Sequence, residues 1–189
     1  MRNTICGLML SMFFALLFSL TITAQSDVFD QSFLSEKGKQ AYSTLVRVQM
    51  FSVGGIGYSG QTSKGELALD VLIEENQATL SFKQLIADGT LEGGLYGVVG
   101  LKMLGCDCFD QEFLRYKELH FGKDNTEKFT IQFGCMGMSS ENPSEKDMIL
   151  NEISTFIFEA AERKECGRMT NGNAQSMREC FAIKKANKK

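Results

Sequence analysis

The chain has 189 residues, with 20 basic and 23 acidic side chains, one histidine and six cysteines. Its charge is unevenly distributed. Residues 25–162 carry 11 basic and 21 acidic side chains, a net charge of −10, whereas residues 163–189 carry 8 basic and 2 acidic ones, a net charge of +6. An acidic body does not suit the polyanionic backbone of DNA or RNA, so we expect no nucleic-acid partner.

The first 24 residues have the pattern of a cleavable secretory signal peptide. A positive start at Arg2 is followed by an apolar run from Ile5 to Ile22, and the small residue Ala24 precedes polar sequence. We predict cleavage after Ala24, which leaves 165 residues of an exported protein, periplasmic or secreted, with no membrane span. The alternative is an uncleaved anchor, because about 18 apolar residues is near the minimum for spanning a bilayer. The serines and threonines within the run weaken that alternative.

Five cysteines remain after this cleavage, and an oxidising compartment favours disulfides over metal ligation. Cys166 and Cys180 stand alone in the polar tail, and we predict that they pair and close a loop of about 15 residues. Cys135 is predicted to pair with Cys106 or with Cys108, and the sequence does not decide between them. The odd number leaves at least one thiol free or paired between chains.

Most of the mature chain is expected to be helical. Apolar residues recur at helical spacing, and Ser63 with Glu66 three residues later has the form of a capping box. A polar–apolar alternation over 127–133 is typical of a strand, and 134–142 is expected to be a loop. The predicted helices cover residues 36–50, 63–76, 77–87, 91–104, 109–119 and 145–164.

The helix predicted over 91–104 is rich in glycine. Gly93, Gly97 and Gly100 recur at intervals of four and three, so they share one helical face. Each glycine costs a helix up to about 1 kcal/mol relative to alanine. Three on one face therefore indicate that another backbone packs very close to it.

We expect a mainly α fold of stacked antiparallel helix pairs, either α-solenoid-like or an irregular orthogonal bundle. It would have one short β segment near 127–133, and an α+β fold is the alternative. Residues 25–165 are predicted to form a single helical domain. Residues 166–189 are predicted to be a basic tail, tethered by a disulfide or disordered.

Two motifs suggest cofactor or metal chemistry, and neither is convincing. Residues 55–60 match a glycine-rich dinucleotide fingerprint, but the next helix starts only at Ser63 and no strand follows to present an acid to a ribose. Cys106, Cys108 and Cys135 with the lone His120 form a possible zinc set, but oxidised cysteines do not ligate metal. We therefore assign no catalytic, cofactor or metal site.

The function expected from the sequence is a non-catalytic protein-interaction module outside the cytoplasm. Its partner would be an unidentified protein, and its oligomeric state is left open. One alternative is a thiol-redox or metal-binding protein that uses Cys106 and Cys108. Another is a membrane-tethered accessory subunit with an uncleaved amino-terminal anchor.

Overall fold

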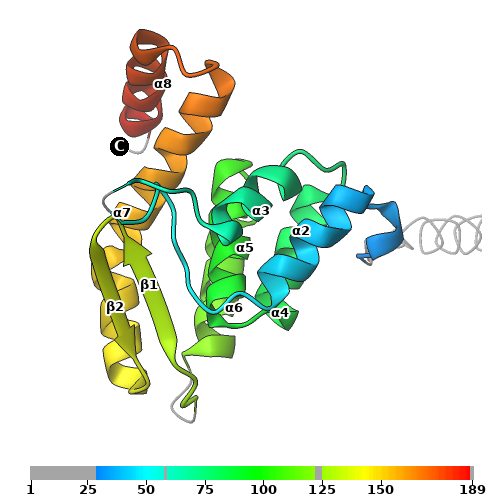
Figure 1. Ribbon diagram of the computed structural model, residues 1–189, viewed down its shortest axis with the longest axis vertical. Helices are drawn as coiled ribbons and strands as arrows, with labels where there is room; N and C mark the ends of the chain where they lie inside the picture. Colours follow the sequence, from blue (N-terminus) through cyan, green and yellow to red (C-terminus); the bar gives the residue numbers. More distant parts are fainter. Residues whose placement is uncertain (1–28, 58, 122–124, 188–189) are drawn as a thin grey trace, which may run out of the picture.

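The computed structural model describes residues 29–57, 59–121 and 125–187. The predicted signal peptide and its cleavage position lie outside these residues. The described chain is mainly helical, with packed helix pairs and one small antiparallel sheet, as predicted (Figure 1). Its elements are a 3₁₀ turn η1 (Gln31–Phe33), helices α2 (Glu36–Val46), α3 (Lys64–Leu72), α4 (Ala78–Asp88), α5 (Leu91–Met103) and α6 (Phe109–His120), strands β1 (Phe129–Phe133) and β2 (Met136–Ser140), and helices α7 (Pro143–Met169) and α8 (Ala174–Ala186).

Helix α5 runs through the centre of the molecule. All of its residues are buried except Lys102, because it is apolar on every side and other elements cover it. Helix α2 pairs with α3, α4 pairs with α5, and α6 and α7 also pack against α5. The core therefore forms around α5 (Figure 1).

The glycine face of α5 lies against neighbouring backbones, as the sequence predicts. A Cβ atom added at Gly97 would lie 2.6 Å from the carbonyl oxygen of Phe82, and one added at Gly93 would clash with the carbonyl oxygen of Leu45. At Gly100 the obstacle is the Phe82 ring, at 2.5 Å. These glycines allow α2 and α4 to approach α5 closely.

The predicted capping box at α3 forms only in part. The hydroxyl of Ser63 accepts a hydrogen bond from the amide of Glu66 at 3.0 Å. The Glu66 carboxylate does not return to the Ser63 amide. It accepts hydrogen bonds from the amides of Gly54 and Gly55 at 3.1 and 3.3 Å instead. The glycine-rich segment is therefore held by a buried carboxylate rather than arranged for a phosphate.

The expectation that 134–142 forms a loop is wrong. Residues 136–140 form β2, which pairs with β1 from Phe129↔Ser140 to Phe133↔Met136. Strand β2 is exposed along most of its length and lacks the alternation of β1, so its pairing depends on backbone hydrogen bonds that leave no pattern in the sequence. Gly134 adopts φ +54° at the tight turn between the strands.

The chain after residue 145 is also more helical than predicted. Helix α7 continues to Met169 and crosses the boundary predicted at residue 165 without a break. It stops where Asn171 and Gly172 take positive φ values of 50° and 74°, and α8 then folds back beside it. At the other end of the chain, α2 ends at Val46 rather than at residue 50.

Candidate functional site

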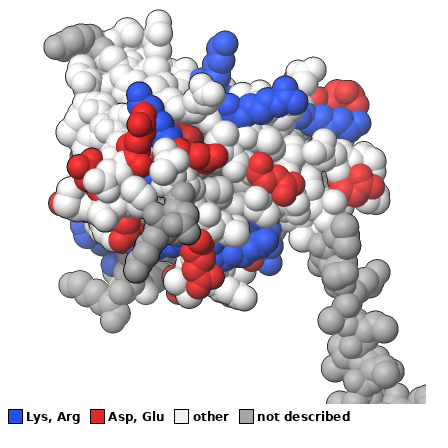
Figure 2. Space-filling view, turned by 90° about the horizontal axis from the view of Figure 1, so that it is seen from below, with Lys and Arg blue, Asp and Glu red and all other residues white. Residues whose placement is uncertain are grey.

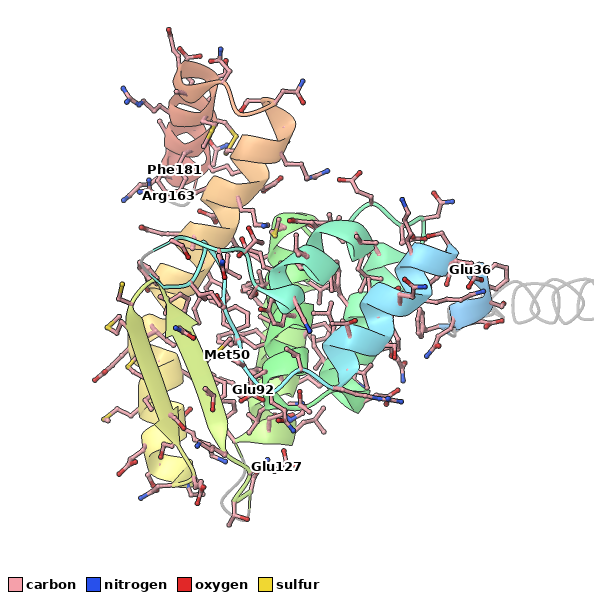
Figure 3. The ribbon with its side chains drawn as sticks, in the orientation of Figure 1. Glu36, Met50, Glu92, Glu127, Arg163 and Phe181 are labelled. Carbon is pink, nitrogen blue, oxygen red and sulfur yellow. A yellow bond between two sulfur atoms is a disulfide. The ribbon has the colours of Figure 1, made fainter. Side chains whose placement is uncertain are left out.

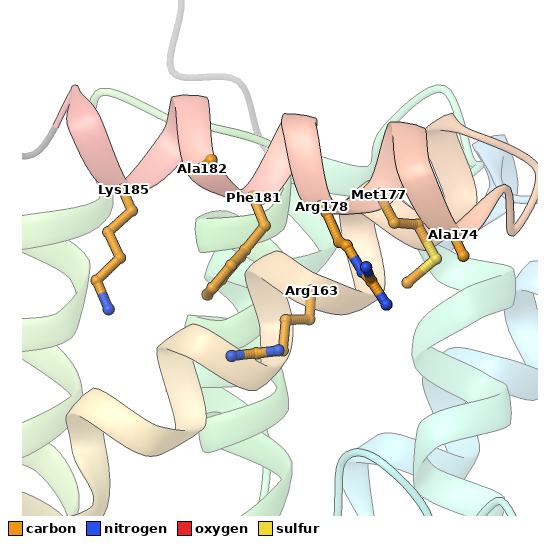
Figure 4. Close-up of a pocket in the computed structure, with 7 residues that line it drawn as sticks. All are labelled: Arg163, Ala174, Met177, Arg178, Phe181, Ala182 and Lys185. Carbon is orange, nitrogen blue, oxygen red and sulfur yellow. The ribbon is translucent and has the colours of Figure 1, made fainter.

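A groove of about 480 Å³ runs between α7 and α8 (Figure 4). Its floor is apolar, and the side chains that α8 contributes recur at intervals of three and four residues, so they lie on one face of this helix. No residue of α8 is buried, because α8 packs mainly on α7 and leaves this face open. The groove is lined by Arg163, Ala174, Met177, Arg178, Phe181, Ala182 and Lys185.

Three cations flank the apolar floor. The Arg163 guanidinium lies 4.3 Å from the centre of the Phe181 ring. The two residues lie close together where α7 meets α8 (Figure 3), and Phe181 points from α8 toward Arg163 (Figure 4). Arg178 is exposed, and Lys185 lies 3.4 Å from the Glu159 carboxylate. Acidic and basic side chains are interspersed on the face that Figure 2 shows, so the basic flank distinguishes the groove from that face.

A disulfide and a second ion pair add to the contacts of Arg163 and Lys185 that hold α8 on α7. The sulfur atoms of Cys166 and Cys180 lie at disulfide distance, with their Cα atoms 5.7 Å apart, and the bridge joins the end of α7 to the middle of α8. Lys184 and Glu165 form an ion pair between the same two helices. The groove is thus built on two helices that are fixed to each other.

Two further hollows adjoin the groove along α7. One, of about 440 Å³, shares Arg163 with it and extends past Phe156 to the turn between β1 and β2. The other, also about 440 Å³, shares Phe181 and Lys185 and extends to Lys102. Phe156 is 53% exposed, which is unusual for a side chain of this size next to a folded core. The open apolar surface is therefore longer than the groove alone.

The remaining cysteines pair differently from the prediction for Cys135. The sulfur atoms of Cys106 and Cys108 lie at disulfide distance from each other, and Cys135 has a free, exposed thiol. Cys135 lies in the turn between β1 and β2, whereas Cys106 and Cys108 both lie just before α6, separated by one residue.

A buried polar cluster lies between α5, α6 and α7. The ammonium of Lys146 donates hydrogen bonds at 2.8 Å to the carbonyl oxygens of Asn125 and Glu127, and burial lowers its pKa. Burial also raises the pKa of Glu92, whose carboxylate accepts a hydrogen bond from the amide of Thr130 at 2.7 Å. These groups complete backbone hydrogen bonding inside the fold, which is a structural role.

His120 belongs to the same region. It is buried, its Nε2 atom lies 2.9 Å from the carbonyl oxygen of Ile86, and burial lowers its pKa. No group of three His, Cys, Asp or Glu side chains is placed to hold a metal ion within the described residues. Among the described helices, none has both the length and the apolar character that a membrane span requires.

The sequence contained a signal for the groove that the prediction of a tail did not use. Ala174, Met177 and Phe181 have helical spacing, and Asn173 before them is a suitable N-cap, which in the structure accepts a hydrogen bond from the amide of Ser176 at 2.9 Å. Comparison with known proteins adds no relative: no protein-family model, curated protein or solved structure matches this chain.

Proposed function

We propose that this chain is an exported protein-interaction module that binds a partner polypeptide in the groove between α7 and α8. The observation that carries the proposal is the open apolar face of α8 flanked by Arg163, Arg178 and Lys185. Apolar side chains left open beside polar rims are typical of protein-binding surfaces. Binding at this groove involves no catalytic step.

The partner segment is expected to be an amphipathic helix with an acidic flank. Its apolar side chains would cover Met177 and Phe181, and its carboxylates would face the three cations, which is the helix-in-groove mode of peptide recognition. Arginine and aromatic side chains supply much of the binding energy in such interfaces. The adjoining hollows along α7 favour an extended polypeptide over a small molecule, because together they exceed what one compact ligand fills.

Export is supported by the order of a positive start, an apolar run and Ala24 at its end. Two cysteine pairs at disulfide distance are compatible with an oxidising compartment. Amino-terminal sequencing of the protein recovered from its native cell tests this part of the proposal. A start at Gln25 supports export with cleavage, whereas a start at Met1 in a membrane fraction supports the uncleaved anchor.

The groove is tested with a synthetic 18-residue amphipathic helical peptide that carries glutamates beside a leucine face. Binding is measured by fluorescence anisotropy against the protein purified without residues 1–24. We expect Phe181→Ala and Arg178→Ala each to weaken binding about tenfold, which corresponds to about 1.4 kcal/mol. The disulfide between Cys166 and Cys180 keeps α8 attached in both variants.

Arg47→Ala is the matched control, because Arg47 is also exposed but lies at the end of α2, outside the groove. A peptide with lysines in place of its glutamates should bind at least about tenfold more weakly, since the three cations then repel it. The proposal is contradicted if both peptides bind equally well. It is also contradicted if Arg47→Ala weakens peptide binding as much as Arg178→Ala does. Binding of laurate at the groove without binding of the peptide also contradicts it, because the ligand would then be a small amphiphile.

A further inference from the structure

We propose that Cys106 and Cys108 form a second, separate site, which exchanges disulfides with cysteines of other polypeptides. The pair is half-buried in the turn between α5 and α6, with the Cα atoms 5.1 Å apart. This site is independent of the groove between α7 and α8, and either can be present without the other.

The pair contributes less to stability than the pair at Cys166 and Cys180 does. A disulfide stabilises a fold mainly by closing a loop of the unfolded chain, and the gain grows with the length of that loop. Cys106 and Cys108 are separated by 2 positions, whereas Cys166 and Cys180 are separated by 14. Backbone hydrogen bonds also hold the turn. The amide of Cys106 donates one to the carbonyl oxygen of Leu101 at 3.1 Å, and the amide of Phe109 donates one to the carbonyl oxygen of Cys106 at 3.0 Å.

The Cys106 sulfur can be reached from outside. Cys106 lines an open, mainly polar hollow of about 360 Å³ together with Lys102, Asp107, Phe109 and Asp110. The Lys102 ammonium lies 4.3 Å from the centre of the Phe109 ring, so it is held over this hollow and attracts an incoming thiolate. An attacking sulfur therefore approaches Cys106 rather than Cys108.

A backbone amide stabilises the Cys106 sulfur as a thiolate. The amide of Cys108 donates a hydrogen bond to the Cys106 sulfur at 3.2 Å, whereas the side chain of Cys108, the N-cap residue of α6, makes no capping hydrogen bond. A sulfur that leaves as a stabilised thiolate leaves faster. The hydrogen bond from the Cys108 amide therefore favours release of the Cys106 thiolate in the second half of the exchange.

The exchange transfers two electrons from the substrate to the pair. A substrate thiolate attacks the Cys106 sulfur, a substrate–Cys106 disulfide forms, and the bond between Cys106 and Cys108 breaks to leave the Cys108 thiolate, which takes a proton. A second substrate thiolate then attacks the substrate sulfur of this mixed disulfide and releases the Cys106 thiolate. The substrate dithiol is oxidised to a disulfide and the pair is reduced to two thiols. Repeated turnover requires another disulfide as oxidant.

The charges around Cys106 favour a polypeptide over glutathione as the substrate. Asp107 and Asp110 line the same hollow as Lys102. Glutathione brings carboxylates as well as its thiolate, and these two side chains repel all of them, whereas a neutral peptide brings the thiolate alone and meets less repulsion.

The test uses the oxidised protein with Cys135→Ser, so that the free thiol does not take part. It is mixed with a neutral synthetic peptide that contains two reduced cysteines, and the peptide disulfide and the protein thiols are followed by mass spectrometry after alkylation. We expect about one peptide disulfide per protein, with the new protein thiols on Cys106 and Cys108. The pair at Cys166 and Cys180 should stay oxidised and serves as the control within the same molecule.

Two comparisons separate the proposed site from a merely weak disulfide. Lys102→Gln should slow the reaction several-fold and Lys102→Arg should restore it, while Lys37→Gln in α2 should have no effect. Reduced glutathione should react more slowly than the neutral peptide. The proposal is overturned if Cys106–Cys108 and Cys166–Cys180 are reduced at the same rate, or if the rate does not depend on the charge at position 102. Neither result bears on peptide binding in the groove.

Discussion

The ammonium of Lys164 lies 2.7 Å from the buried carboxylate of Glu66, and this ion pair joins α7 to α3. The same carboxylate accepts hydrogen bonds from the amides of Gly54 and Gly55. The Lys164 ammonium also lies 2.9 Å from the carboxylate of Asp70. The half of α7 that carries the groove is therefore joined to the body of the molecule by this buried acid, in addition to the ion pair between Arg168 and Glu74.

Removal of Lys164 should destabilise the fold. Lys164→Met leaves the Glu66 carboxylate buried without its cation, and we expect a loss of about 1–3 kcal/mol in the free energy of unfolding, measured with urea. Lys39→Met is the control, because Lys39 pairs with an exposed Glu36 and such pairs contribute little. Similar losses in the two variants would contradict the role given to Glu66.

Two glycine-to-alanine substitutions should have opposite effects. Gly97→Ala places a methyl group 2.6 Å from the Phe82 carbonyl oxygen and should destabilise the protein by about 1–3 kcal/mol through overpacking. Gly167→Ala in α7 places it 3.6 Å from Met177, an ordinary contact, and should stabilise by up to about 1 kcal/mol through helix propensity. Thermal unfolding of both variants checks the signs. If Gly97→Ala leaves the thermal stability unchanged, α4 and α5 are not packed this closely.

Glu92 should make stability depend on pH. Burial raises the pKa of Glu92 in the folded protein above its value in the unfolded chain. The contribution of the protonated side chain to the free energy of unfolding is therefore fully present below about pH 4.5, and it is lost as the pH rises through the pKa in the folded protein. Glu92→Gln stays neutral, and its stability relative to the wild type should increase between pH 4.5 and pH 7. Urea unfolding at both pH values measures this change.

The control for that experiment is Glu118→Gln on the exposed face of α6. The difference in stability between Glu92→Gln and this control is compared at pH 4.5 and at pH 7. If Glu92→Gln behaves like this control, the Glu92 carboxylate is solvated rather than buried.

Loss of the disulfide between α7 and α8 should affect both stability and binding. Replacement of Cys166 and Cys180 by serine removes the closure of a loop of about 15 residues, worth about 3 kcal/mol in the chain-entropy treatment. Because no residue of α8 is buried, α8 should detach first, and peptide binding should fall before the body unfolds. Circular dichroism and fluorescence anisotropy along one urea titration distinguish these two events.

The sequence predicts the helices that bury an apolar stripe and misses the elements that do not. The glycine face of α5 was predictable because Gly93, Gly97 and Gly100 repeat with the helical period. Strand β2 was not, since its residues are mostly exposed and depend on backbone pairing with β1. Helix α8 was missed because its apolar residues are few and it is held by Cys180 and Lys184 rather than by burial.

The same physics limits what could be predicted of the sites. Pairing of Cys166 with Cys180 was expected from their isolation in the tail, and the structure places their sulfur atoms at disulfide distance. The partner of Cys106 depended on the unforeseen strand β2, which places Cys135 in a hairpin turn. The groove needs both the extension of α7 and the reversal at Gly172, and neither leaves a periodic signal.

The most direct test of the central claim is to locate the bound peptide by NMR. The acidic amphipathic peptide is added to ¹⁵N-labelled protein, and shifts of the backbone amide signals are mapped onto the structure. We predict that the shifts gather at Arg163 and along α8 from Ala174 to Lys185, and that the helices α2 to α4 stay unchanged. Shifts that gather on α2 to α4, or that leave α8 unaffected while the peptide is bound, would contradict the assignment of the groove as the binding surface.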